Sequence, residues 1–290
     1  MHRTMIALAG GAAAILGAVA PAGAITNEWV DDAVHDYVGL VVALDEDGEA
    51  LRRCAGTLVG HTTVITAGHC TDGATTARVY FQADAAASVD PGAERDASTG
   101  YPDECAPGTL GVWCVESDDL YDFGFDHFAS FPDTRDVGLI VLAAPPSAVT
   151  GRALLPGPDV LDPLSRGPER NRTVFTVSGY GSSRSEPPAP TEQHTRRMAS
   201  SRLTNLRSSL NDGFNLQSNG NGRGFEGNCV GDGGDPVFLG DVESDTIVAV
   251  TSFGLDSWCR GTDFSYRIDR LEVLEWIGGG YLDTPQEPAG

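Results

Sequence analysis

The stretch Cys229-Val230-Gly231-Asp232-Gly233-Gly234-Asp235-Pro236 decides the fold that this sequence predicts. Two stretches earlier in the chain belong with it. Residues 54–58 read Cys-Ala-Gly-Thr-Leu and are followed at 64–70 by Val-Ile-Thr-Ala-Gly-His-Cys, while residues 136–142 read Asp-Val-Gly-Leu-Ile-Val-Leu. A turn that carries a histidine therefore comes first, an aspartate before an apolar run comes second, and a glycine-rich loop comes third.

These stretches resemble, in the same order, the histidine, aspartate and nucleophile motifs of trypsin/chymotrypsin-like serine proteases, in particular those of the secreted bacterial type. Other folds with a Ser-His-Asp triad carry the three residues in a different order. Residues 177–181 (Val-Ser-Gly-Tyr-Gly) and 250–254 (Val-Thr-Ser-Phe-Gly) fit the same family, so the likeness extends over residues 25–278. The resemblance implies an all-β fold of two antiparallel six-stranded β-barrels with a short C-terminal helix.

The resemblance assigns the catalytic positions to His69, Asp136 and Gly233, and glycine stands where the family has its nucleophilic serine. In the family's mechanism the histidine takes the proton of the serine and the aspartate orients the histidine. The backbone N–H groups of Gly231 and Gly233 would still form an oxyanion hole, but Gly233 has no atom that can attack a carbonyl. In subtilisin, an unrelated protease, loss of the nucleophile lowers kcat by about 2 × 10⁶.

We therefore expect a protease homologue that is catalytically inactive and acts by binding. The alternative is an active serine endopeptidase whose working form has serine at position 233, since serine and glycine codons can differ by one base.

Two further departures from the family concern the specificity pocket and the nucleophile loop. The resemblance forms the pocket from Gly227, Ser252, Phe253, Gly254 and Phe264. Gly227 takes the floor position, where an aspartate would select arginine or lysine, and Phe264 replaces a glycine that keeps the pocket open. In the loop, Asp235 replaces a second glycine and would add a side chain to a tight turn. Three losses at nucleophile, loop and pocket favour the inactive form.

The first 24 residues have the pattern of a secretory signal peptide. One arginine precedes an apolar run of small residues, and Ala22-Gly23-Ala24 fits a cleavage site. An uncleaved membrane anchor is the alternative. Cleavage would start the mature chain at Ile25 without a propeptide, and the resemblance implies an ion pair between the new ammonium group and Asp232.

The expected product is a secreted protein with one protease domain at 25–279. Its parts are a first barrel at 25–145, a second barrel at 168–268, a C-terminal helix at 269–278 and a tail at 280–290.

Six cysteines, an even number in an exported chain, favour disulfides over metal ligation. The resemblance implies the bridges Cys54–Cys70 and Cys229–Cys259, which leave Cys105–Cys114 as a third. Zinc is the competing interpretation, but the chain has no Cys-x2-Cys pair and the resemblance gives His69 another role. We therefore expect no metal and no cofactor.

The segment 83–128 is longer than the family needs between histidine and aspartate, and it is acidic. We expect a solvated loop outside the first barrel, with calcium binding through its carboxylates as the alternative. His2, His35, His61, His127 and His194 lie outside any motif, and we expect surface or structural roles for them.

Charge narrows the class of partner. The chain has 41 acidic and 19 basic residues, a formal net charge of -22, and no lysine. Such a surface repels phosphate backbones, so nucleic acid is not an expected partner. We expect a protein or peptide ligand, no membrane association after signal cleavage, and a monomer.

Overall fold

The computed structural model describes residues 30–87, 92, 94–97, 99–102, 105, 113–181, 194–219, 233–255 and 262–282. Several predicted features lie outside these residues, namely the signal peptide, Ile25, Gly227, Cys229, Gly231, Asp232, Cys259 and most of the tail. Within the described ranges the chain forms two antiparallel β-sheets with short helices, and none of those helices has the length and apolar character needed to cross a membrane.

The first sheet contains seven strands in the order β6-β5-β2-β3-β4-β8-β7. Their bounds are β2 Val38–Leu44, β3 Ala50–Leu58, β4 Thr63–Thr66, β5 Thr76–Tyr80, β6 Cys114–Ser117, β7 Asp119–Asp122 and β8 Gly138–Val141. The edge strands β6 and β7 are separated in sequence by Asp118 alone, so they form one bent strand that joins both edges. The sheet therefore closes into a barrel of six strands in effect.

The second sheet has the order β1-β10-β11-β14-β13-β12-β9, and β10 also pairs with β9. Its strands are β1 Val30–Asp31, β9 Val174–Gly179, β10 Arg197–Asn205, β11 Asn215–Asn219, β12 Pro236–Leu239, β13 Ile247–Gly254 and β14 Thr262–Arg267. The second pairing of β10 closes six strands into a barrel, and β1 is added beside β10. The predicted fold of two antiparallel six-stranded barrels is confirmed.

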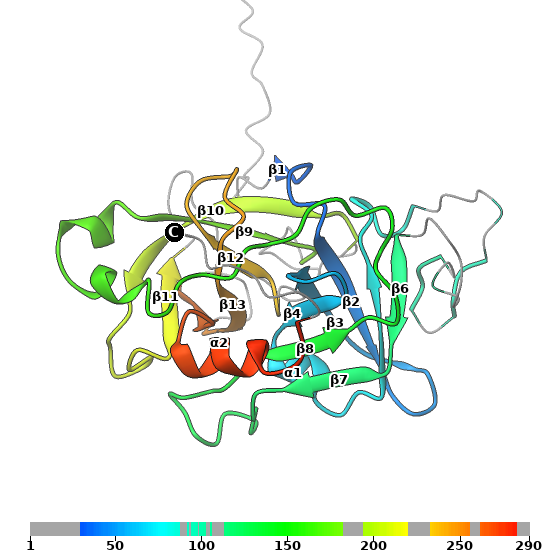
Figure 1. Ribbon diagram of the computed structural model, residues 1–290, viewed down its shortest axis with the longest axis horizontal. Coiled ribbons are helices and arrows are strands. Elements are labelled where there is room, and N and C mark those ends of the chain that lie inside the picture. Colours follow the sequence, from blue (N-terminus) through cyan, green and yellow to red (C-terminus); the bar gives the residue numbers. More distant parts are fainter. Residues whose placement is uncertain are drawn as a thin grey trace, which may run out of the picture.

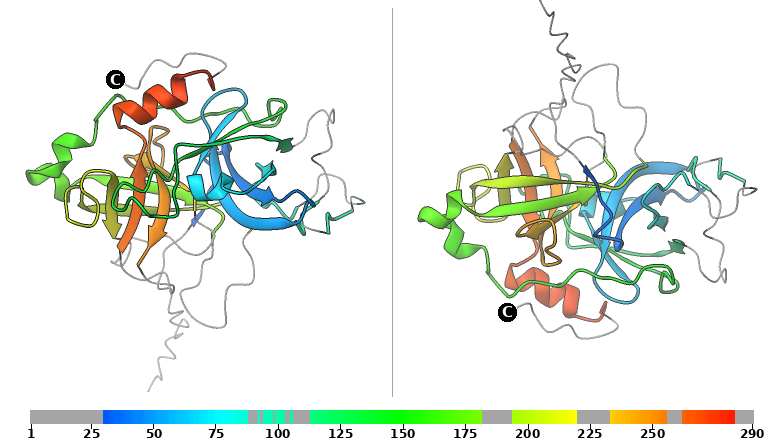
Figure 2. Two further views of the ribbon diagram at one scale, coloured as in Figure 1. Left: turned by 90° about the horizontal axis from the view of Figure 1, so that it is seen from below. Right: turned by 90° about the horizontal axis from the view of Figure 1, so that it is seen from above.

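The helices are short, and their bounds are α1 Gly68–Thr71, the 3₁₀ turns η1 Asp162–Ser165 and η2 Pro168–Asn171, and α2 Leu271–Gly278. α1 connects β4 and β5, the two 3₁₀ turns connect the sheets, and α2 follows the last strand. Figure 1 and Figure 2 show the two sheets side by side, with α2 against their lower face in the first view. One cluster of buried apolar side chains contains residues of both barrels and of α2, for example Ile65, Val250 and Ile277. The two barrels and the helix therefore share a core.

The prediction that residues 83–128 lie outside the first barrel is wrong for their second half. β6 pairs with β5, and β7 pairs with β8. The disulfide Cys105–Cys114 is also formed, and both of its cysteines are buried in a cluster with Tyr80 and Tyr101. Acidic side chains in these strands are partly exposed, so the charge pattern suggested a solvated loop. The charge pattern of a segment carries no information about the backbone hydrogen bonds that complete the sheet.

The C-terminal helix begins at Leu271, two residues later than predicted. Val273 and Ile277, four residues apart and therefore on one face, are buried, whereas Leu271 is 51% exposed. Asp269, predicted to be the first helical residue, is buried. Its carboxylate accepts the backbone N–H of Leu161 at 2.9 Å and pairs with Arg267 at 2.8 Å. This tertiary contact holds Asp269 ahead of the helix.

Candidate active site

Strand pairing brings the predicted histidine and aspartate together. β4 and β8 are antiparallel neighbours, and Thr66 pairs with Gly138. His69 follows Thr66 by three residues on α1, and Asp136 precedes Gly138 by two residues. Both side chains are therefore delivered to the same end of the first barrel.

Asp136 is fully buried and accepts three different donors. Its carboxylate oxygens lie 2.9 and 3.2 Å from Nδ1 of His69, and Oδ1 accepts the backbone N–H of His69 at 2.7 Å. The hydroxyl of Ser252, on β13 of the second barrel, donates to Oδ2 at 2.5 Å. A carboxylate held in this way fixes the imidazole ring with Nδ1 inward and Nε2 outward. The resemblance puts Ser252 in the pocket, and its bond to Asp136 is a further role for this side chain.

Gly233 lies directly against the imidazole of His69. Its carbonyl oxygen accepts the N–H of Ala55 at 2.8 Å, and the next residue, Gly234, donates its N–H to the carbonyl of Thr251 at 2.8 Å. The loop is thus fixed to both barrels. A Cβ atom added to Gly233 would overlap Nε2 of His69 and lie 2.9 Å from Cε1 of the same ring. The ring therefore takes up the space that a side chain at position 233 would need.

The glycine that this turn requires is Gly234. Its φ of 81° lies in the left-handed region, and a Cβ there would overlap the carbonyl oxygen of Ala55. Asp235, which we expected to obstruct the turn, does not have a positive φ and is fully buried. Its carboxylate lies over Gly179, where an added Cβ would overlap it. The side chain of Asp235 is therefore accommodated by a bare glycine opposite it.

The expected pocket wall contains a stack of aromatic rings. Phe253 on β13 pairs with Phe264 on β14, and their rings are 4.6 Å apart and nearly parallel. Phe264 is fully buried, and the rings of Phe128 and Phe131 contact Phe253 edge-on at 5.4 and 6.0 Å. This wall of the site is therefore lined by aromatic rings. Gly227, the predicted pocket floor, and Gly231, the predicted oxyanion donor, are outside the described residues.

Aromatic residues of the loop before Asp136 also reach the histidine, although no motif in the sequence points to them. The ring of Phe125 lies 6.1 Å from that of His69 and 5.3 Å from that of Phe128. Nearby, the hydroxyl of Tyr266 donates to Asp133 at 2.7 Å. Burial and the charge of Asp133 raise the pKa of Tyr266 far above its usual range, so this phenol stays a neutral donor.

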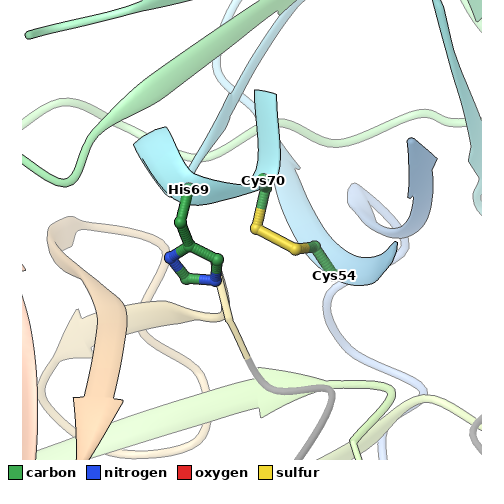
Figure 3. Close-up of side chains that lie close together, drawn as sticks. All are labelled: Cys54, His69 and Cys70. Carbon is green, nitrogen blue, oxygen red and sulfur yellow. A yellow bond between two sulfur atoms is a disulfide. The ribbon is translucent and has the colours of Figure 1, made fainter. Parts of the chain in front are cut away.

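The predicted bridge Cys54–Cys70 is formed and lies beside His69, as Figure 3 shows. Cys54 comes from β3, and Cys70 follows His69 on α1. In the part of the chain that the structure describes, these three residues make up the one group of three or more metal-binding side chains. Because both sulfurs are in the disulfide, they offer no thiolate in this state.

No protein-family model matches the chain, and no curated protein matches its sequence. Solved structures do match. A structure described as HL collagenase has 17% sequence identity and a TM-score of 0.59 over 87% of this chain and 98% of the other. Human heparin binding protein has 20% identity and a TM-score of 0.58 over 91% and 100%, and a double mutant of it gives 0.57. At these identities the likeness shows the fold alone, and the fold of this chain is chymotrypsin-like.

Proposed function

We propose that this chain is a secreted homologue of trypsin-like serine proteases that does not cleave peptide bonds and acts by binding a protein or peptide. One observation carries the proposal: Gly233 meets the imidazole of His69, and an added Cβ would overlap Nε2. In this proposal His69 takes the position of the base, Asp136 that of the orienting acid and Gly233 that of the nucleophile, where no side chain is present. Without an attacking oxygen, the His–Asp pair has no serine proton to accept.

Without a nucleophile, the remaining groups of the site would support only slow hydrolysis of peptide bonds. In the triad mechanism, the oxyanion hole and substrate binding without a triad member give on the order of 10³ to 10⁴ over water. This is far below the rate that the complete triad provides, because covalent catalysis is lost. The stacked Phe253 and Phe264 further support loss of protease function, since the resemblance puts a glycine, and not a ring, at position 264 of the pocket.

Binding is the function that such a site can still perform. Phe128 and Phe131 are 37% and 42% exposed beside the site and offer apolar surface to a ligand. Both a collagenase and a heparin binding protein are among the structures of this fold that match. A polyanion such as heparin does not suit this chain, because its net charge of -22 repels anions. A protein or peptide is the class of ligand that we propose.

The proposal that the protein is secreted rests on its amino-terminal sequence and on its disulfides. The apolar segment before Ile25 has the pattern of a signal peptide, and Cys54–Cys70 and Cys105–Cys114 are bonds of oxidising compartments. Sequencing the amino terminus of the exported protein should give Ile25 as the first residue. A start at another position would contradict the proposed cleavage.

The test of inactivity is covalent labelling. A fluorophosphonate probe reacts with an activated serine, so the exported protein should remain unlabelled and should not hydrolyse casein or small esters above background. The matched sample is the His69→Ala variant, which removes the base and should give the same background. Labelling of the natural protein that disappears in His69→Ala would overturn the proposal.

The second candidate is an active serine endopeptidase with serine at position 233. The intact hydrogen bonds of Asp136 to His69 and Ser252 favour it, because they are the bonds that orient a catalytic histidine. Mass spectrometry distinguishes the inactive homologue from the active endopeptidase. It is applied to the peptide that contains residue 233, prepared from protein of the natural source. Glycine at that position excludes this candidate.

A further inference from the structure

Four aromatic side chains form a continuous band along β7 and α2, which lie on the lower side of the molecule in Figure 1. This aromatic band consists of Tyr121, Phe123, Trp276 and Tyr281, and each of the four residues is partly exposed. The ring centroids are 5.3 Å apart for Phe123 and Trp276, 5.6 Å for Trp276 and Tyr281, and 4.6 Å for Tyr281 and Tyr121. The band therefore presents ring surface to solvent from two segments that are far apart in sequence.

The inner side of the aromatic band is fixed by the fold. All four side chains pack against the core that the two barrels and α2 share. The backbone N–H of Phe123 donates to the carbonyl of Val137 at 2.8 Å, and the hydroxyl of Thr63 donates to the carbonyl of Tyr281. Side chains that are already held in place lose little conformational entropy when a ligand binds. The band is therefore pre-organised for contact with a partner.

One end of the band carries a carboxylate. Asp119 and Tyr121 are two residues apart on β7, so their side chains lie on the same face of the strand. The hydroxyl of Tyr121 donates to the exposed carboxylate of Asp119 at 3.3 Å. The charge of Asp119 raises the pKa of Tyr121, so the phenol stays neutral beside it. This end of the band thus combines a negative charge with apolar ring surface.

Two arginines of the chain itself show which ligand suits such a surface. The guanidinium of Arg135 lies over Phe123, 6.0 Å from the ring centroid, and also donates to the carboxylate two residues before it. The guanidinium of Arg270 lies 4.3 Å from the ring centroid of Phe214 and donates to Glu272 at 2.8 Å. A planar guanidinium can stack its face on a ring while its edge donates hydrogen bonds to a carboxylate. Arginine therefore uses a ring and a carboxylate together.

We propose that the Asp119 end of the aromatic band binds an arginine side chain of a basic partner protein. The guanidinium stacks on the ring of Tyr281 and donates to the carboxylate of Asp119. Lysine fits less well, because its ammonium group is strongly hydrated and has no planar face. The net charge of -22 attracts a basic protein and repels a second copy of this chain, so the occupant is a different protein. This surface adds to the one proposed beside His69 and does not depend on it.

The experiment uses the full chain and a fluorescent peptide of repeated Gly-Arg units, with binding followed by fluorescence anisotropy at low ionic strength. Two peptides of the same length carry lysine or citrulline, the neutral isostere, in place of arginine. The arginine peptide should bind most tightly and the citrulline peptide least. Asp119→Asn should weaken binding of the arginine peptide by about 10-fold, because a charge-assisted hydrogen bond is lost.

The matched control is Asp122→Asn. Asp122 is exposed on β7 as well, but it lies on the opposite face of the strand from Asp119. Its carboxylate accepts the backbone N–H groups of Gly124 and Phe125 at 2.7 and 3.0 Å, and asparagine keeps an acceptor oxygen for them. Both variants remove one negative charge, so attraction by net charge alone would change equally. Equal affinities of the two variants would overturn the proposal, as would equal binding of the arginine and citrulline peptides.

Variants of Tyr281 test the stacking contact. Tyr281→Leu removes the ring and should weaken binding of the arginine peptide by about 2- to 5-fold. Tyr281→Phe keeps the ring and should bind as tightly as the natural protein. Thermal unfolding of each variant shows whether it is folded. If Tyr281→Leu does not fold, the comparison of Asp119→Asn with Asp122→Asn decides the proposal alone.

A variant of the other site separates this inference from the proposed function. Phe128→Ala changes the surface beside His69 and leaves β7 and α2 as they are, so it should bind the arginine peptide like the natural protein. Loss of binding in Phe128→Ala, with normal binding in Asp119→Asn, would place the peptide beside His69. That result would overturn the second surface and leave the proposed function standing.

Discussion

Two clusters in this molecule have the same three residue types and nearly the same geometry. Asp136 accepts Nδ1 and the backbone N–H of His69 and the hydroxyl of Ser252 at 2.9, 2.7 and 2.5 Å. In the second cluster, Asp32 accepts Nδ1 and the backbone N–H of His35 and the hydroxyl of Ser178 at 2.8, 3.0 and 2.5 Å. Three hydrogen bonds to a buried carboxylate therefore do not define a catalytic site.

The clusters differ at the other nitrogen of each histidine. Nε2 of His35 faces the carbonyl oxygen of Ser244 at 3.1 Å, and its fully buried ring stacks on Phe238 at 4.6 Å. Nε2 of His69 instead faces Gly233, and its side chain is 26% exposed. One imidazole is fixed at both nitrogens and serves the fold. Among the described residues, the imidazole of His69 is held at Nδ1 by Asp136, and its Nε2 remains available to a ligand that reaches the site.

The largest expected effect on stability comes from removing the imidazole of His35, with removal of the His69 imidazole as the comparison. His35→Ala takes one partner from a fully buried pair and should cost about 3 to 5 kcal/mol of unfolding free energy. His69→Ala should cost only about 1 to 2 kcal/mol, because water can reach the carboxylate through the exposed position. Urea titration of both variants measures the difference. Equal costs would show that the exposure of His69 does not relieve Asp136.

The two serine hydroxyls provide a matched pair. Ser178→Ala and Ser252→Ala each remove one hydrogen bond to a buried carboxylate, and each should cost about 1.5 to 3 kcal/mol. Because both bonds are 2.5 Å long and both carboxylates are buried, the two costs should agree within the error of chemical denaturation. A much smaller cost for Ser252→Ala would mean that the second barrel holds Asp136 only loosely.

The sequence predicted one of these clusters and not the other. His69 and Asp136 stand in motifs next to β4 and β8, and strand pairing then determines their contact. His35 is buried against Asp32, but Ser178, which donates to the same carboxylate, is distant in sequence, and no motif joins it to Asp32. Contacts made by tertiary packing leave no motif in the local sequence.

The same limit applies to two strands of the second barrel. β10 and β11 contain buried polar residues such as Ser201 and Asn215 in place of an alternating apolar pattern. Their neighbours in the sheet, and not their own hydrophobicity, make them strands. A pattern of apolar residues alone therefore does not predict β10 and β11, although the barrel could not close without them.

The loss of unfolding free energy at acidic pH should depend on Asp32 of the second cluster. Burial alone would raise the pKa of Asp32, but the hydrogen bonds and charge of His35 and the hydroxyl of Ser178 lower it well below its usual range. A depressed folded pKa contributes stability that is present above the unfolded value of 3.8 and is lost as pH falls below it. Unfolding free energies measured from pH 6 to about pH 2 should therefore fall less steeply in Asp32→Asn than in the natural protein, with the difference growing below the unfolded value of 3.8. Parallel curves would contradict the assignment.

The smallest expected effect is the gain in activity from restoring the nucleophile. In Gly233→Ser, the new Cβ would overlap His69, whose Nδ1 is held by Asp136, so the ring must shift before the hydroxyl can reach Nε2. Hydrolysis of small esters should therefore stay near the level of Gly233→Ala, the matched variant without a hydroxyl.

Second-site changes identify what else obstructs the restored site. Adding Phe264→Gly to Gly233→Ser should raise activity, since it removes the ring stacked on Phe253. Adding Asp235→Gly should not, since the backbone of Asp235 is unstrained and its carboxylate has space over Gly179. Full activity from Gly233→Ser alone would show that the imidazole moves freely. The contrast with the doubly fixed ring of His35 would then be greater than the structure indicates.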